Sequence, residues 1–302
     1  MNPSPRERSP AGCALCGAGD THTVVHGRDR LLRVPGEFSV RACHHCGLGE
    51  TAPRLDEDAL RPYYAADYSP HETGSGSAGL REARARAKLR LGPFRELIRI
   101  PAGRALEVGC GSGRLGEWLT VRGWNVTGVE PSPRAAAAAR ARGLTVHAAS
   151  FADVALEPES FDAVLFDHSL EHLSDPLAAL AKARALLRPG GVLFATVPDF
   201  GSWQRRLFGT YWFHLELPRH VTHFEARTLV RALSDGGFRD VQTRSSVTSV
   251  GFWASLQYVV ARRCVLTGRA RAVGLVLADL TYPLLLLTRV FGGDVIVATA
   301  RR

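Results

Sequence analysis

The segment Glu107-Val-Gly-Cys-Gly-Ser-Gly113 decides the fold class, because this glycine-rich loop stands between a predicted strand and a predicted helix. The strand covers Arg104 to Val108, and the helix runs from Arg114 to Arg122 and is closed by Gly123. In such an arrangement the backbone N–H groups of the loop and the N-terminus of the helix face a bound ligand. The loop therefore predicts a nucleotide-type cofactor site at the edge of a parallel sheet.

Further strands alternate with helices downstream of the loop. The predicted strands cover Asn125 to Val129, Thr145 to Ala148, Phe161 to Phe166, Val192 to Val197, Arg239 to Thr248 and Asp294 to Ala300. Ser132-Pro133 and Asp175-Pro176 each supply a cap and a first-turn proline for an intervening helix. This alternation predicts an α/β protein with a doubly wound, seven-stranded Rossmann-like sheet.

The glycine loop is compatible with two cofactor types. Gly111-Ser-Gly113-Arg-Leu-Gly116 is a literal G-x-G-x-x-G, which is typical of NAD sites. Against NAD, Glu107 stands where a carboxylate would repel a pyrophosphate but could face a cationic sulfonium or ammonium group. Glu130, after the second strand, suits a bidentate grip on ribose hydroxyls.

Two C-x-x-C pairs precede this domain, and they predict a zinc ribbon over residues 11–50. The predicted ligands are Cys13, Cys16, Cys43 and Cys46, with Gly17 and Gly47 permitting each turn. Short β-type stretches lie between the pairs, at Thr23 to Val25, Leu31 to Val34 and Phe38 to Val40. Four thiolates fill a tetrahedral shell, so we expect structural Zn²⁺. The alternative is four buried cysteines without metal, although so few apolar residues surround them that folding would then lack support.

The remaining segments are assigned by composition. Residues 1–10 resemble a frayed tail, and residues 51–99 a helical connector or lid. Residues 100–302 form the expected cofactor domain, with a helical hairpin inserted at about 250–292. The apolar, arginine-flanked segments within 252–291 suit peripheral contact with the inner surface of a membrane, or a homodimer contact.

The bulk properties fit a cytoplasmic enzyme. The chain has 302 residues, room for one large domain and a small module, and a formal net charge of +9. The positive charge is nearly all arginine on expected helix faces and is not interleaved with aromatic residues, which counts against nucleic acid as a partner. The N-terminal residues lack the apolar core of a secretory signal.

The successive motifs resemble class I S-adenosylmethionine-dependent methyltransferases. The motifs are Glu107 to Gly113, Val129-Glu-Pro131, Phe161-Asp-Ala-Val, Ser169-Leu-Glu-His-Leu-Ser-Asp-Pro176 and Leu187-Arg-Pro-Gly-Gly-Val-Leu193. Leu217-Pro-Arg-His-Val-Thr-His-Phe224 resembles a subgroup with an N-terminal four-cysteine zinc module. Some members of that subgroup C-methylate nucleotide-linked sugars, and others act on small metabolites or lie in surface-glycan pathways.

The resemblance implies roles for individual residues. Gly109, Cys110, Gly111 and Gly113 would wrap the methionine part of S-adenosylmethionine, with Glu107 near its amino group and Glu130 on the ribose. Ser150 and Phe151 stand where the family commonly has an acidic residue that reads the adenine, so the contact falls to the serine hydroxyl or the Phe151 backbone. His168 would lie beside the sulfonium.

A weak oxygen or carbon nucleophile also needs a general base, for which histidine is best suited near neutral pH. His220 is the first candidate and His223 the second. The other candidates are His168, His172, His214 and Glu216; alternatively, the histidines cap a helix or bond backbone groups. The leading prediction is transfer of a methyl group to a small-molecule acceptor, such as a nucleotide-linked or lipid-linked sugar or another secondary metabolite. Two alternatives remain open, an RNA methyltransferase that uses the ribbon to bind RNA and a non-catalytic scaffold that binds the cofactor.

Overall fold

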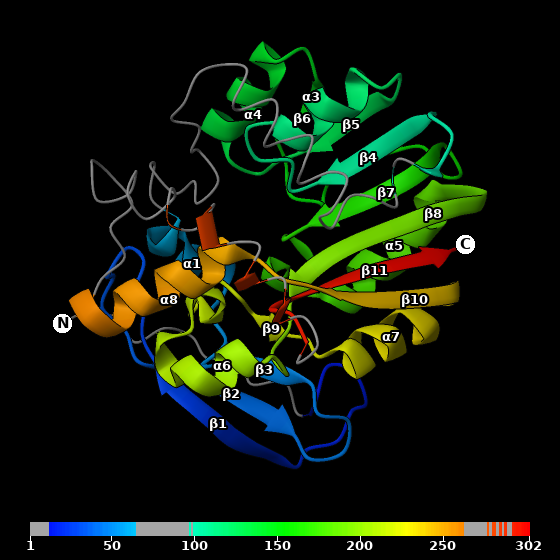
Figure 1. Ribbon diagram of the computed structural model, residues 1–302. Coiled ribbons are helices and arrows are strands. Elements are labelled where there is room, and N and C mark those ends of the chain that lie inside the picture. The colour runs from blue at the N-terminus through cyan, green and yellow to red at the C-terminus, as the bar shows by residue number, and fades with distance from the viewer. Residues whose placement is uncertain are drawn as a thin grey trace.

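The computed structural model describes residues 12–64, 97, 99–262 and 292–302, together with positions 277, 280, 281, 284, 285, 287 and 288. A seven-stranded sheet, in the order β10-β11-β8-β7-β4-β5-β6, dominates this part of the chain (Figure 1). Five of its strands are parallel, and β11 is antiparallel to both β8 and β10. The expected α/β, doubly wound, Rossmann-like fold is confirmed.

The strands and helices of this domain follow the sequence prediction closely. Its strands are β4 (Arg104–Val108), β5 (Asn125–Val129), β6 (Thr145–His147), β7 (Phe161–Asp167), β8 (Leu187–Pro198), β10 (Arg239–Ser246) and β11 (Val295–Arg301). Its helices are α3 (Arg114–Thr120), α4 (Pro133–Ala141), α5 (Pro176–Leu186), α6 (Trp203–Phe208), α7 (Ala226–Asp235) and α8 (Ser249–Ala261). The two predicted caps are present, because Ser132 and Asp175 accept hydrogen bonds from Ala135 N–H and Ala178 N–H.

The sheet is buried on both faces because successive side chains of a strand point to opposite sides. In β7, Val164 and Phe166 pack with α5 and α7, whereas Ala163 and Leu165 pack in a second cluster with α3 and α4. All four side chains are at most 1% exposed. Burial of this kind contributes about 25 cal/mol per Å² of apolar surface, so the two-sided core fixes the strand register.

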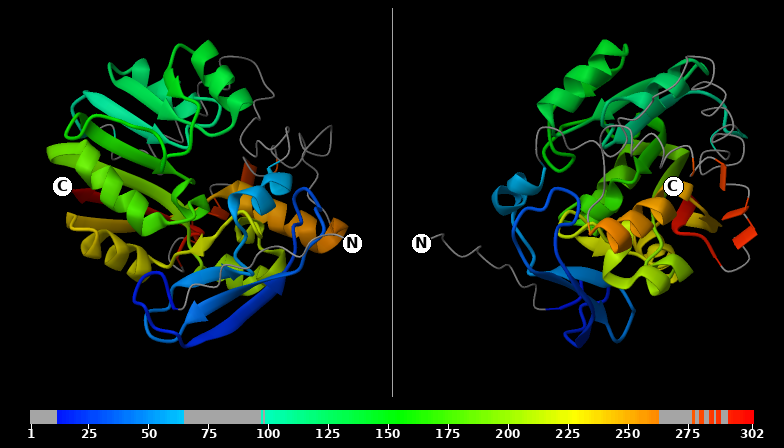
Figure 2. Two further views of the ribbon diagram at one scale, coloured as in Figure 1. Left: turned by 180° about the vertical axis from the view of Figure 1, so that it is seen from behind. Right: turned by 60° about the vertical axis from the view of Figure 1, so that its left-hand side comes forward.

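The N-terminal segment forms a second, four-stranded sheet in the order β1-β2-β3-β9. Its strands are β1 (Thr21–Gly27), β2 (Phe38–Cys43), β3 (Gly49–Ala52) and β9 (Thr222–His223). The fourth strand comes from the cofactor domain, and its register pairs Gly49 with His223 and Glu50 with Thr222. Figure 2 shows the blue N-terminal strands lying against the yellow-green part of that domain. The ribbon is therefore joined to the larger domain by a shared sheet.

One predicted strand of the ribbon is wrong. Residues 31–34 form a loop, because the carboxylate of Asp29 accepts hydrogen bonds from the backbone N–H groups of Leu31, Leu32 and Val34. These bonds curl the chain around Asp29 and use up N–H groups that a strand would need for its ladder.

Several predictions fall on other parts of the chain. The tail at 1–10 and residues 65–96 of the connector lie outside the described residues, as does most of the second half of the insertion. The described part of the connector contains α1 (Glu57–Leu60) and a short turn at Arg61–Tyr63. In the part of the chain that the structure describes, no helix combines the length and the apolar character needed to cross a membrane.

Candidate active site

The cofactor loop adopts a left-handed backbone conformation that costs glycine little free energy. Gly109, Gly111 and Gly113 all have positive φ, at +73°, +52° and +80°. A Cβ at Gly109 would lie 2.7 Å from Ser169 Cβ, and one at Gly113 would lie 2.8 Å from Ala139 Cβ. A Cβ at Gly111 would meet nothing within 4 Å. The first and third glycines are thus required by packing, and the second borders open space where a ligand fits.

Two buried carboxylates flank this loop. Glu107, at the end of β4, is 3% exposed, and its Oε2 has no hydrogen-bond partner among the described residues. Burial, together with the charge of Asp167, raises the pKa of Glu107 well above its usual value. A cationic group beside Glu107 would relieve this cost, so the residue fits the amino group of S-adenosylmethionine.

Glu130 supports the loop from β5. Its Oε2 accepts a hydrogen bond from Gly111 N–H and its Oε1 accepts one from Ser132 N–H, both at 2.9 Å. Burial raises the pKa of Glu130, and the two N–H groups oppose that shift. Each carboxylate oxygen can accept a further bond, so the residue fits two ribose hydroxyls.

The other predicted cofactor contacts lie around the same edge. Ser150 Oγ donates to Asp153 Oδ2 at 2.7 Å, so an acidic residue stands close to the position where the sequence shows serine. Phe151 is 4% exposed, and its ring packs edge-on against Phe166. Its carbonyl oxygen accepts a hydrogen bond from Lys182 Nζ at 2.7 Å, so the N–H is the backbone group that could face a ligand. Cys110 is buried, and a Cβ at Gly128 would lie 2.6 Å from its Sγ. Its thiol therefore packs against β5.

His168 lies at the carboxyl end of β7 with φ at +51°. Its Nδ1 lies 3.4 Å from Glu171 Oε1, and its ring stacks on that of His214 at 6.1 Å between centroids. Burial disfavours the imidazolium, but the carboxylates of Glu171 and Asp167 outweigh that effect and raise the pKa of His168 to about 9. Glu171 and His214 therefore hold the His168 ring in place at the strand end.

His220 and His172 lie next to each other beyond β7, with ring centroids 4.5 Å apart in an edge-on arrangement. His220 is 3% exposed, and burial together with His172 holds its pKa well below the usual value. Its Nδ1 lies 2.8 Å from the carbonyl oxygen of His214. A carbonyl only accepts, so Nδ1 carries the proton and Nε2 keeps its lone pair.

His223 occupies a different environment. It lies in β9, where its Nε2 is 2.9 Å from Thr51 Oγ1, and Thr51 Oγ1 donates to the His220 carbonyl at 2.6 Å. The Thr51 hydroxyl donates its only proton to that carbonyl, so it can only accept a hydrogen bond from His223. His223 Nε2 therefore carries a proton and donates. Burial and the charge of Arg205 lower the pKa of His223 to about 3. This geometry ties the ribbon to the candidate site and leaves His223 without a free lone pair on Nε2.

A buried ion-pair network supports the segment that carries His220. Arg219 is fully buried and donates to Asp29 Oδ1 at 2.8 Å, to Glu216 Oε1 at 3.0 Å and to the Tyr63 carbonyl at 3.1 Å. Glu216 in turn lies 3.5 Å from His220 Nε2. The loop around Asp29 in the N-terminal module thus fixes the side chains around His220.

The four cysteines converge as the sequence predicts. Their Sγ atoms all lie within 4.8 Å of one another, with Cys13 and Cys46 at 3.4 Å and Cys16 and Cys43 at 3.6 Å. Sulfur atoms on a tetrahedral zinc with Zn–S bonds of about 2.3 Å are separated by roughly 3.8 Å, so the quartet fits Zn²⁺. Gly17 and Gly47 have the positive φ that each turn requires.

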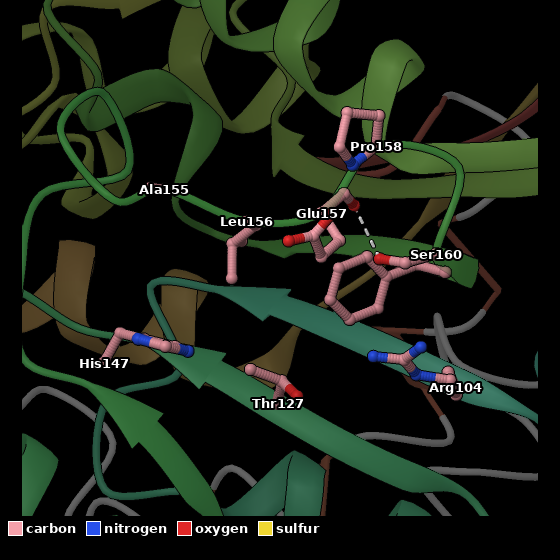
Figure 3. A pocket seen from close by; sticks show the side chains of 9 residues that line it. Arg104, Thr127, His147, Ala155, Leu156, Glu157, Pro158 and Ser160 are labelled. Carbon is pink, nitrogen blue, oxygen red and sulfur yellow. Dashed lines mark hydrogen bonds between the residues drawn. The ribbon is translucent and has the colours of Figure 1, made fainter.

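A pocket of about 330 Å³ lies elsewhere, below the loop at 155–160 (Figure 3). It is lined by Arg104, Thr127, His147, Ala155, Leu156, Glu157, Pro158, Ser160 and Phe161. Neither the glycine loop nor the histidine cluster contributes to that lining. We therefore take the carboxyl edge of the sheet, and not this pocket, as the candidate site.

The sequence interpretation did not single out Glu171, Arg219, Asp29 or Thr51. Glu171 belongs to a quoted motif directly after β7, and its position past the end of a parallel strand was the available signal. Asp29 and Thr51 carry no such signal, since they reach the site only through tertiary contacts with residues far along the chain.

Comparison with known proteins points to one family. A family model described as a methyltransferase domain matches residues 78–243, which is more than half of the chain. A ubiquinone biosynthesis O-methyltransferase of Xanthomonas campestris pv. campestris (strain B100) is 38% identical over 137 residues, covering 42% of this chain and 57% of the relative. A protein of the same description from Cereibacter sphaeroides (strain ATCC 17025 / ATH 2.4.3) is 35% identical over 124 residues, covering 38% and 50%. The chain thus spans only about half the length of these relatives.

Solved structures share the fold. A SAM dependent methyltransferase from Archaeoglobus fulgidus matches with a TM-score of 0.51 and 19% identity, over 75% of this chain and 95% of the other. Phosphoethanolamine N-methyltransferase 2 of Haemonchus contortus, in complex with S-adenosyl-L-methionine, matches with a TM-score of 0.52 and 17% identity, over 81% and 59%. At these identities the likeness extends to the fold alone.

Proposed function

The chain belongs to the methyltransferase domain family, and from this premise we propose that it transfers a methyl group from S-adenosylmethionine to a small-molecule acceptor. The observation that carries the proposal is the loop itself: open space at Gly111, the Glu130 carboxylate bonded to the Gly111 N–H, and the buried carboxylate of Glu107 at the end of the preceding strand. A cationic, ribose-bearing cofactor satisfies all three features. Gly109, Cys110 and Gly113 would complete the cradle, with Ser150 and the Phe151 backbone at the adenine.

The acceptor belongs to the class of small molecules with an acidifiable hydroxyl or carbon. The relatives from Xanthomonas campestris and Cereibacter sphaeroides, whose names describe O-methyltransferases, support this class. A nucleotide-linked or lipid-linked sugar, or another secondary metabolite, is our more specific proposal. The buried, polar histidine cluster supports an acceptor that forms hydrogen bonds.

Bound S-adenosylmethionine supplies an electrophilic methyl group on a sulfonium. The chain's own residues then have two tasks, to align the acceptor for an in-line displacement and to receive its proton. We assign the proton-accepting position to His220, because its Nε2 carries a lone pair in a buried cluster beyond the end of β7. His223 is assigned to support of this segment through Thr51.

Replacing Gly111 with aspartate should abolish most binding of S-adenosylmethionine while leaving the protein folded. Nothing in the protein lies within 4 Å of a Cβ there, so the new side chain competes with the ligand and not with the core. The left-handed backbone adds strain of roughly 1–2 kcal/mol. Isothermal titration calorimetry measures the affinity, and thermal melting measures the fold.

Gly190→Asp is the matched control, because Gly190 has φ of +79° and equally open surroundings but lies in the exposed first part of β8. It should carry the same strain and bind the cofactor normally. Equal affinity for S-adenosylmethionine in both variants and the wild type would contradict the assignment of the loop as the cofactor site. Tighter binding of NADH than of S-adenosylmethionine by the wild type would overturn the proposed reaction.

We also propose that Cys13, Cys16, Cys43 and Cys46 bind one structural Zn²⁺. Purified protein should contain at least one zinc per chain by atomic emission, and Cys43→Ser should lower that content by about one. Because β3 pairs with β9, the loss should also weaken turnover, whereas affinity for S-adenosylmethionine should change little. Zinc-free wild-type protein that retains the four-stranded sheet would refute the site.

The remaining predictions from the sequence stay predictions. They are a cytoplasmic location, which could include the inner membrane surface, a homodimer, and peripheral membrane contact through residues 252–291. The proposed small-molecule acceptor assigns no role to nucleic acid.

A further inference from the structure

In the histidine cluster, the unprotonated ring nitrogen of His220 faces two carboxylates. His220 Nδ1 donates to the His214 carbonyl, so its Nε2 is a lone-pair atom. That atom lies 3.5 Å from Glu216 Oε2 and 4.0 Å from Glu171 Oε1. Carboxylate oxygens and an imidazole lone pair repel one another when no positive charge lies between them.

His172 has the same tautomer. Its Nδ1 lies 3.1 Å from the carbonyl oxygen of Arg219, which can only accept, so the proton is on Nδ1 and the lone pair on Nε2. The hydroxyl of Tyr64 also lies 3.0 Å from Nδ1. Histidines that ligate metals characteristically donate their other N–H to a backbone carbonyl, and His172 and His220 both do so.

Glu171 is the third member of the cluster. It is 1% exposed, and neither carboxylate oxygen has a hydrogen-bond partner among the described residues. The nearest cation is His168, whose Nδ1 is 3.4 Å from Oε1. A buried carboxylate without hydrogen bonds raises the free energy of the folded protein. A cation bound on the side of Glu171 that His168 does not cover lowers that free energy.

We infer that Glu171, His172 and His220 form a binding site for a divalent transition-metal cation beside the cofactor pocket. One ligand atom from each residue lies within 4.8 Å of the other two. Donors bound at about 2.1 Å to a common ion, with angles of about 90–109° between the bonds, are roughly 3.0–3.4 Å apart. Binding must therefore shorten the 4.0 Å between His220 Nε2 and Glu171 Oε1. Two imidazoles and one carboxylate suit Zn²⁺, Mn²⁺ or Fe²⁺.

The site has a catalytic use that rests on the proposed methyl transfer. Three protein ligands leave coordination positions open, and a hydroxyl bound there loses its proton more easily. The O–H bond then breaks with its proton passing to the carboxylate of Glu216, the oxygen bonds the methyl carbon, and the C–S bond breaks to leave S-adenosylhomocysteine. With the cation bound, His220 Nε2 is a metal ligand that helps to orient the acceptor, and the proton-accepting role passes from His220 to Glu216.

The site is tested by adding Mn²⁺ to protein whose four-cysteine site has first been saturated with zinc. Loss of the free-ion signal in electron paramagnetic resonance should show one Mn²⁺ bound per chain. Glu171→Gln and His220→Gln should each weaken this binding by at least about tenfold. His147→Gln, a change at an exposed histidine in β6, should leave it unchanged. Thermal melting and S-adenosylmethionine calorimetry on each variant show that the fold is retained.

A second measurement does not depend on variants. Bound Mn²⁺ should strongly broaden the methyl proton resonance of S-adenosylmethionine on the wild-type protein, because the ion lies next to the cofactor pocket. No binding of Mn²⁺ or of zinc beyond the four-cysteine ion, or equal binding in all variants, would overturn the cation site. S-adenosylmethionine binding and methyl transfer in that case would still uphold the proposed function, and their absence alone would refute that function while leaving the cation site intact.

Discussion

His220→Ala is expected to lower turnover by about 10²–10⁴-fold while affinity for S-adenosylmethionine stays near that of the wild type. The ring lies beyond the end of β7 in a cluster with His172 and Glu171, whereas the proposed cofactor contacts come from the loop after β4 and from Glu130. Removing the ring therefore takes away the proton acceptor or, with the cation bound, one ligand of that cation. The proposed cofactor contacts stay intact. Single-turnover rates and calorimetry separate the two effects.

His223→Ala is the discriminating control. Its Nε2 bonds Thr51, so the substitution should lower stability more than it lowers turnover. Equal and severe losses of turnover in both variants would mean that the pair only holds this segment in place. A His220→Ala rate close to wild type would remove His220 from the mechanism.

Asp29→Ala is expected to destabilise the protein by about 3–5 kcal/mol, the range for removing one partner of a buried ion pair. Both side chains of the Asp29–Arg219 pair are fully buried. The substitution also leaves three backbone N–H groups of the 31–34 loop without their acceptor. Urea denaturation should show a lower midpoint, and the folded fraction should have reduced turnover because Arg219 no longer holds Glu216 in place.

Asp58→Ala provides the comparison, since Asp58 pairs with Arg61 in full contact with solvent. Exposed pairs of this kind contribute about 0–1 kcal/mol, so its denaturation curve should nearly overlay the wild type. Indistinguishable midpoints for Asp29→Ala and Asp58→Ala would contradict a structural role for the buried pair.

The cofactor half of the site could be predicted from the sequence because its determinants are local. Gly109, Gly111 and Gly113 are close neighbours in the chain, and glycine is the residue type expected where the backbone has a positive φ. Glu130 follows one βαβ step later, at a separation that parallel-sheet geometry fixes. The alternation of strand and helix segments along the chain likewise predicted the doubly wound sheet.

The acceptor half depends on the tertiary structure. The sequence placed four cysteines on two turns but could not show that β3 pairs with β9, or that Asp29 reaches Arg219 across 190 positions. It marked residues 31–34 as a strand, because apolar and β-branched residues indicate a strand whether or not a carboxylate takes their N–H groups. Such contacts have no period and no fixed spacing, since they arise only when two separately encoded surfaces are packed together. The sequence therefore determined the sheet, the cofactor loop and the cysteine turns, whereas packing alone decided which histidine keeps a free lone pair, because hydrogen-bond partners from distant segments fix the tautomer.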